Sequence, residues 1–231
     1  TTGAKSVKWA AMFVSESSRL MHSIPDGQKA LDGAWIGSGV DTPDRTTVPA
    51  GERRLPYHME SAIGVFRAAQ EEHLPLDIVT EQDVEDGARL NEYRVLILPN
   101  TSCISDKALM KIRRFVERGG GLVALQESSL YDEFANPREN FGLADLYKVS
   151  FEGVEDHSAR WPNYPNPVSV TLSSHEITTS DVIAQNYRYD ADFLDYIGLT
   201  TNVVAKPDGQ VIVSQNGPGK PFLVVSGAGK G

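Results

Sequence analysis

The sequence has one cysteine, Cys103, among 231 residues. A single cysteine excludes a disulfide within the chain and a metal centre built from several thiolates. The histidines offer no alternative, because none stands in the H-x-x-x-H or H-x-H pattern on which a zinc site could be built. We therefore expect neither a metal nor a cofactor.

Long apolar runs and positive charge are also scarce. No run approaches the length of about 20 residues that a membrane-spanning helix needs, and residues 1–8 lack the basic-then-apolar order of a signal peptide. The formal net charge is -9, without a stripe of Lys and Arg, whereas nucleic-acid binding needs concentrated positive charge. We expect neither a membrane nor a nucleic acid as partner, and a cytoplasmic location is favoured.

The most regular stretch covers residues 93–129 and predicts a strand, a helix and a second strand. Residues 94–98 form a short apolar run, typical of a strand buried on both faces of a parallel sheet. Ser105 is a suitable N-cap for a helix that ends at the glycines of residues 119–121, before a strand over residues 122–125. The apolar residues of this helix recur at helical spacing: Leu109, Ile112, Phe115 and Val116.

Similar elements precede this stretch. A strand is expected over residues 7–15, a helix over residues 57–74, a strand over residues 76–80, and a polar connector with a helical turn over residues 81–91. The apolar face of the first helix is predicted to consist of Met59, Ile63, Phe66 and Ala69. This alternation predicts a parallel sheet covered by helices on both faces.

The rest of the chain departs from the alternation. Residues 25–56, rich in Gly, Pro, Asp and Thr, form a long excursion that could be a lid, an interface arm or a surface flap. Beyond a short helix over residues 141–147, β-rich segments follow, and the last two, residues 211–214 and 222–225, suggest a hairpin or meander at the edge of the sheet. No linker divides the chain, so we expect one domain over residues 1–231.

Polar residues gather at the predicted carboxyl ends of the strands, where open parallel sheets bind their ligands. The residues predicted to line a ligand cleft there are Ser15, Glu16, Asn100, Gln126 and Glu127. Glu16 and Glu127 could lie close enough to raise the pKa of one carboxyl group, as acid/base chemistry requires. Alternatively, both carboxylates simply bind the loop backbone.

Two residues are candidate nucleophiles for a small hydrolase in which Glu16 or Glu127 is the acid or base. Cys103 shortly precedes a helix, whose N-terminus can depress the pKa of a thiol, although a buried structural cysteine is the alternative. Ser128 lacks the G-x-S-x-G context of a hydrolase serine. A ligand-sensing module without chemistry is a further alternative. Several aromatic residues could stack on a sugar or form subunit contacts: Trp161, Tyr164, Tyr187, Tyr189 and Tyr196.

The central part of the chain resembles the trimerisation domain of family 42 β-galactosidases, within the class I glutamine amidotransferase-like superfamily. The resemblance is carried by four segments: Leu98-Pro99-Asn100, Phe115-Val116-Glu117-Arg118-Gly119-Gly120, Tyr131-Asp132-Glu133 and Phe141-Gly142-Leu143-Ala144-Asp145-Leu146. It extends over most of the chain, to the G-x-G-K-G of residues 227–231. Because the chain also begins without Met, we expect it to be part of a longer polypeptide.

The resemblance implies a flavodoxin-like doubly wound parallel sheet with a β-rich C-terminal extension. In amidotransferase relatives a cysteine nucleophile follows the strand that here ends at Leu125, whereas this chain has Gln126 there. In family 42 enzymes the glycosidic carboxylates lie in a separate barrel domain, which this chain does not resemble. The implied function is a non-catalytic domain that acts in homo-oligomerisation, as a trimer, or in shaping a neighbouring carbohydrate site.

Overall fold

A computed structural model describes residues 7–23, 57–156, 170–179, 199–215 and 220–227. Internal contacts divide the chain into two compact units, the first ending at Gly142 and the second beginning at Leu143. The predictions for residues 25–56, for the five sugar-stacking aromatic residues and for the closing Gly-Lys-Gly lie outside the described residues.

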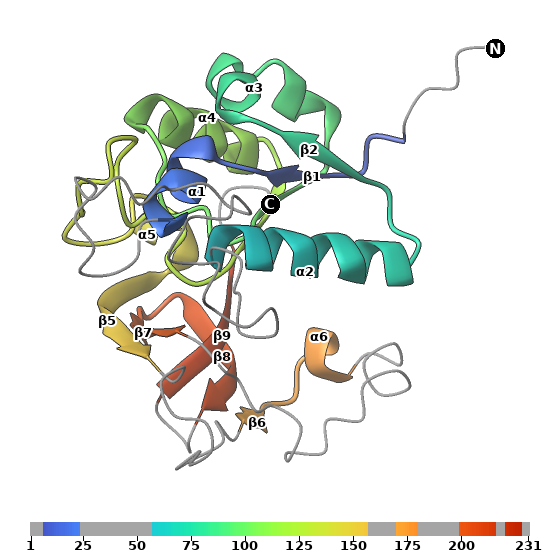
Figure 1. Ribbon diagram of the computed structural model, residues 1–231. Coiled ribbons are helices and arrows are strands. Elements are labelled where there is room, and N and C mark those ends of the chain that lie inside the picture. The colour runs from blue at the N-terminus through green and yellow to red at the C-terminus, as the bar shows by residue number, and fades with distance from the viewer. Residues whose placement is uncertain (1–6, 24–56, 157–169, 180–198, 216–219, 228–231) are drawn as a thin grey trace, which may run out of the picture. The chain divides into compact units, whose positions relative to one another are not determined.

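A four-stranded parallel sheet forms the centre of the first unit (Figure 1). Its strands are β1 (Ala10–Phe13), β2 (Leu76–Val79), β3 (Val95–Leu98) and β4 (Gly121–Ala124), in the order β2-β1-β3-β4. Ala10 pairs with Leu76 on one side and with Val95 on the other. All four residues of β1 are buried, as expected for a central strand covered on both faces.

Helices cover both faces of this sheet. Figure 1 shows α1 (Glu16–Ser23) and α2 (Tyr57–Glu71) on one side, with α3 (Glu81–Asp86) and α4 (Asp106–Glu117) on the other. A 3₁₀ helix, η3 (Arg89–Glu92), follows α3, so the predicted connector contains two helical segments. The doubly wound, flavodoxin-like architecture is confirmed.

The N-terminal cap and buried face predicted for α4 are confirmed. The Ser105 Oγ accepts a hydrogen bond of 3.2 Å from the Ala108 N–H. The apolar residues at helical spacing are buried: Leu109, Ile112, Phe115 and Val116. After the helix the chain passes close to Phe115, because a Cβ placed on Gly120 would lie 2.4 Å from its ring. A glycine is therefore required at this position.

The predicted apolar face of α2 is confirmed at Ala69 but is wrong at Phe66, because the buried face is rotated by about one residue. The buried residues of α2 include His58, Ala62 and Ala69, whereas Phe66 is 44% exposed. Hydrophobic spacing alone favours the large side chains, but the helix is buried through its small alanines, which leaves Phe66 at the margin. This rotation places His58 on the inner face of the helix.

The second unit is built mainly from antiparallel strands, which confirms the β-rich extension. Strand β5 (Val149–Asp156) pairs with β7 (Leu199–Ala205), and β8 (Gly209–Gln215) pairs with both β6 (Val170–Leu172) and β9 (Lys220–Ser226). The two short helices are α5 (Ala144–Tyr147) and α6 (Glu176–Thr179).

One expectation for the second unit is wrong, and one of its strands was not predicted. The hairpin strands β8 and β9 belong to a separate three-stranded sheet with β6, not to the edge of the parallel sheet. Strand β5 was not predicted, because Glu152, Gly153 and Asp156 lower its β-propensity and a register shift near Gly153 interrupts its alternation.

Among the described residues, β2 and β4 are the edge strands of the parallel sheet. Val123 in β4 is 46% exposed, and Ile78 in β2 is 50% exposed. Both edges therefore present apolar side chains to solvent.

Candidate functional site

His58 joins the carboxyl ends of β1 and β3. The Ser15 N–H donates a hydrogen bond of 3.0 Å to His58 Nε2, while His58 Nδ1 lies 2.9 Å from the Pro99 carbonyl oxygen and 3.2 Å from that of Asn100. Because Nε2 accepts, the ring proton is on Nδ1 and is donated to these carbonyls. Burial lowers the pKa of His58, which favours the neutral ring that this pattern requires.

His22 forms a second layer over His58. The His22 Nδ1 accepts a hydrogen bond of 3.1 Å from the His58 N–H. Its Nε2 lies 3.1 Å from Ser102 Oγ and 3.7 Å from a carboxylate oxygen of Glu127, whose side chain is 10% exposed. Because Nδ1 accepts an N–H, the proton of a neutral ring is on Nε2. His22 in this arrangement is not a general base for Ser102.

Asn100 connects the ends of β3 and β4. Its Oδ1 accepts hydrogen bonds from the Glu127 N–H at 3.1 Å and from Ser102 Oγ at 3.2 Å. The backbone of Asn100 has a φ of 54°, in the left-handed region that asparagine tolerates better than most residues. We refer to the side chains of His22, His58, Asn100, Ser102 and Glu127 as the strand-end cluster.

The two candidate nucleophiles are buried and engaged. The Ser128 Oγ lies 2.7 Å from the Leu125 carbonyl and accepts a hydrogen bond of 3.0 Å from the Thr101 N–H. Cys103 is 1% exposed, its Sγ lies 3.5 Å from the sulfur of Met21, and burial raises its pKa to about 11. The alternative of a buried structural cysteine holds, because desolvation outweighs the proximity of a helix.

Cys103 is accordingly expected to resist alkylation. At pH 8 a thiol with a pKa near 11 carries about 100 times less thiolate than one with a pKa near 9, before any steric protection. Iodoacetamide labelling followed by mass spectrometry checks this, with the chain unfolded in urea as the reference. Labelling at similar rates in both states would show that the thiol is accessible and would contradict the buried position.

The residues predicted to line a cleft fall into two groups. Ser15, Asn100 and Glu127 are buried, whereas Glu16 is exposed and Gln126 is partly exposed. A hydrogen bond from Arg19 lowers the pKa of Glu16, so the idea that a neighbouring carboxylate raises this pKa is wrong for Glu16. Gln126 has a φ of 51° and turns the chain sharply after β4.

Sequence reasoning missed the central roles of His22, His58 and Ser102. The burial of His58 could have been inferred from helical spacing, since Ala62 and Ala69 follow it on the same face of α2. A buried histidine at the first turn of a helix needs polar partners, and parallel strand ends supply free carbonyl and amide groups.

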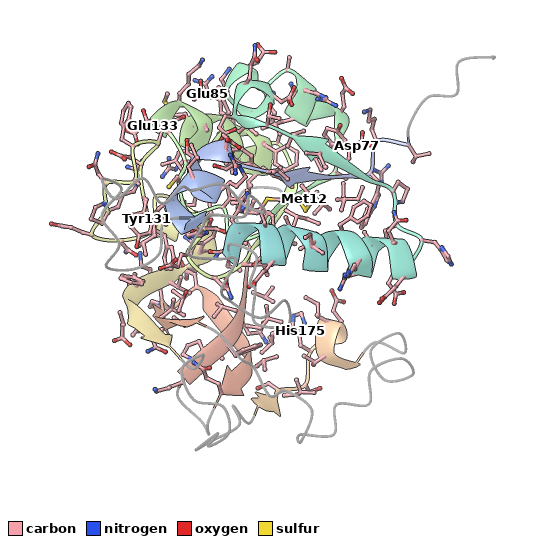
Figure 2. The ribbon with its side chains drawn as sticks, in the orientation of Figure 1. Met12, Asp77, Glu85, Tyr131, Glu133 and His175 are labelled. Atoms are coloured by element: carbon pink, nitrogen blue, oxygen red, sulfur yellow. The ribbon has the colours of Figure 1, made fainter. Side chains whose placement is uncertain are left out.

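A loop over residues 130–138, here called the Phe134 loop, follows this cluster. Three backbone hydrogen bonds hold its base: Tyr131 N–H to the Ser102 carbonyl at 3.0 Å, Ile104 N–H to the Tyr131 carbonyl at 3.1 Å, and Arg138 N–H to the Leu130 carbonyl at 2.8 Å. Tyr131 and Glu133 both project from this segment in Figure 2.

The tip of the Phe134 loop is fixed by Asp132. One carboxylate oxygen of Asp132 accepts hydrogen bonds from the Phe134 N–H at 2.9 Å and the Asn136 N–H at 2.8 Å, and the other accepts from the Asn136 side chain at 2.8 Å. Hydrogen bonding, chiefly from Asn136, lowers the pKa of Asp132. Phe134 is 78% exposed, so an ordered loop presents an aromatic ring to solvent.

The described residues offer neither a metal site nor a membrane-spanning helix. The described ranges contain no group of three or more His, Cys, Asp or Glu residues placed to hold a metal ion. In the same part of the chain, no helix combines the length and apolar character needed to cross a membrane.

A doubly wound sheet with an internally bonded strand-end cluster defines the chain as a flavodoxin-like α/β domain in which the two candidate nucleophiles, Cys103 and Ser128, are buried. The sequence pattern of the β-galactosidase trimerisation domain matches residues 44–206. The chain therefore belongs to this family, a non-catalytic domain of glycoside hydrolases. Comparison with curated proteins finds no match.

Solved β-galactosidases share the fold. The enzyme from Bacillus circulans aligns over all of this chain and 28% of its own, with 14% identity and a TM-score of 0.64. The enzyme from Rahnella sp. R3 aligns over 97% of this chain and 27% of its own, with 17% identity and a TM-score of 0.59. The enzyme from Halorubrum lacusprofundi aligns over 98% and 27%, with 12% identity and a TM-score of 0.60. The chain thus spans about a quarter of the length of these enzymes.

Proposed function

We propose that residues 1–231 act as one domain of a longer carbohydrate-active protein, in which they pack copies of that protein into a trimer. The family is described by its role in trimerisation, which supports homo-oligomerisation of the parent protein. The structurally similar enzymes are β-galactosidases in which the corresponding segment makes up about a quarter of the chain. Hydrolysis of a galactoside or a related sugar is assigned to the remainder of the parent.

The non-catalytic assignment rests on the strand-end cluster, whose polar groups are buried and bonded to one another or to the backbone. An active site needs a nucleophile or base that can reach a substrate, but Ser128 and Cys103 are each only 1% exposed. The acceptor nitrogen of each histidine is already occupied by a backbone N–H group: that of Ser15 for His58, and that of His58 for His22. The cluster therefore supports a role in holding three strand ends together.

The Phe134 loop supplies a contact suited to a protein partner. An exposed aromatic ring on a loop that is already ordered loses little entropy on binding, which is the property of interface anchors. A sugar would need polar groups beside the ring, but the carboxylate of Asp132 and the amide of Asn136 are bonded to each other and to the loop backbone. We assign Phe134 to the contact with another copy of the chain.

Light scattering at several concentrations tests the proposal on both the parent protein and this chain. We expect the parent protein to have the mass of a trimer. For this chain alone, we expect the measured mass to increase with concentration. If both are monomers throughout the concentration range, oligomerisation is removed as the function.

A further inference from the structure

A pocket of about 200 Å³ lies between the end of α3, the 3₁₀ helix η3 and α4. It is separate from the strand-end cluster and shares no residue with it. Lys111 and Arg114 of α4 line it together with Arg118, the residue at the C-cap of this helix, at spacings of three and four residues that place the three cations on one side. The floor is formed by the buried side chains of Leu90 and Phe115.

The three cations lack carboxylate partners in the described part of the chain. Lys111 Nζ donates to the backbone carbonyl of Asp86 at 2.9 Å, and Arg118 donates to the side-chain oxygen of Asn91 at 2.9 Å. The Arg114 side chain is exposed and has no hydrogen-bond or ion-pair partner within these ranges. Other cations of the first unit do pair with carboxylates: Lys8 with Asp77, Arg19 with Glu16, Arg89 with Asp83, Lys107 with Glu85, and Arg138 with Asp106.

The pocket is consequently positive in a chain whose net charge is -9. Asp86 is the acidic residue among its lining residues, against three cations. Gly87 has a φ of 74°, and a Cβ at this position would lie 2.7 Å from the Lys111 Cδ. The glycine therefore lets the Lys111 side chain lie across the turn and reach the pocket.

We propose that this pocket binds the phosphate group of a small molecule. Guanidinium groups donate paired N–H bonds in a planar fork that matches phosphate oxygens, and an ammonium adds a further donor. Neutral acceptors hold Lys111 and Arg118 in place without cancelling their charge, and Arg114 is left to bind the ligand. The inference is independent of the oligomeric state of the parent.

The test is an NMR titration of the whole chain with inorganic phosphate, with ionic strength held constant by NaCl so that general screening is not measured. Saturable shifts confined to residues 86–91 and 111–118 are expected. The double substitution Arg114→Gln and Arg118→Gln is expected to weaken phosphate binding by about 100-fold, at about tenfold for each charge-assisted contact.

Arg67→Gln is the control for a cation outside the pocket, since Arg67 is exposed on α2 and its removal lowers the net charge by one, as each of the two pocket substitutions does. Binding unchanged by Arg67→Gln and lost in the double variant supports the site. Shifts that never saturate, or equal weakening by Arg67→Gln, would overturn it. All three positions are exposed, so the variants are expected to unfold at the same temperature as the unsubstituted chain. Thermal unfolding thereby checks that each variant is folded.

Discussion

Replacing His58 with leucine is expected to lower the free energy of unfolding by about 3 kcal/mol, because several buried backbone groups lose their partner at once. The Ser15 N–H and the Pro99 carbonyl both depend on the imidazole, and His58 itself is fully buried. Urea unfolding measures the change. Gln70→Leu is the matched control on the exposed face of α2, and it should change stability little.

His58 also makes stability depend on pH in a definite direction. Its folded-state pKa is lowered, so its contribution is complete above the unfolded value of about 6.5 and decreases as the pH falls below it. Carboxyl groups with lowered pKa values, such as Asp132, affect the stability at lower pH than His58 does. Stability should therefore fall between pH 7 and pH 5, and His58→Gln should reduce this slope. An unchanged slope in His58→Gln would assign the pH dependence to another group.

Replacing Phe134 with serine is expected to weaken association of the parent protein by about 30-fold or more, the effect of losing an anchor worth about 2 kcal/mol. The reason is the combination of 78% exposure with a loop that Asp132 holds in one conformation. A dilution series followed by analytical ultracentrifugation measures the dissociation constant. This prediction depends on the proposed oligomerisation.

Two further variants distinguish the contact made by the Phe134 ring from the ordering of the Phe134 loop. Phe66→Ser removes another exposed phenylalanine, 44% exposed on α2, and should leave association unchanged. Asp132→Ala retains the ring but frees the loop tip, and it should weaken association by about tenfold through the added cost of ordering the loop. Equal dissociation constants for the parent sequence and Phe134→Ser would remove Phe134 from the interface while leaving oligomerisation itself intact.

The fold of the first unit was predictable because its signals are local. Apolar runs of four or five residues indicate β3 and β4, and the Ser105 cap with its helical spacing indicates α4. Strand β5 was missed because Gly153 and acidic residues obscure its alternation. The separate antiparallel sheet was missed because hairpin signals show which strands pair and not which sheet receives them.

The position of the candidate site could be predicted from the sequence, but its hydrogen-bond partners could not. Ser15, Asn100 and Glu127 do follow strands whose ends converge, as the alternation implied. His58 depends on the rotation of α2, which small alanines set and apolar periodicity misplaces. The state of Cys103 depends on three-dimensional burial, and its distance from a helix in the sequence contains no information about desolvation.

The edge of β4 has a consequence for handling the chain on its own. In the described part of the molecule β4 has a strand on one side, so the backbone N–H and C=O groups along its other side are available to another extended segment. With Val123 half exposed beside them, this border can serve as a template on which unfolded or misfolded copies add as extra strands. We therefore expect concentrated preparations to aggregate through this border, and we expect Val123→Lys to reduce that aggregation.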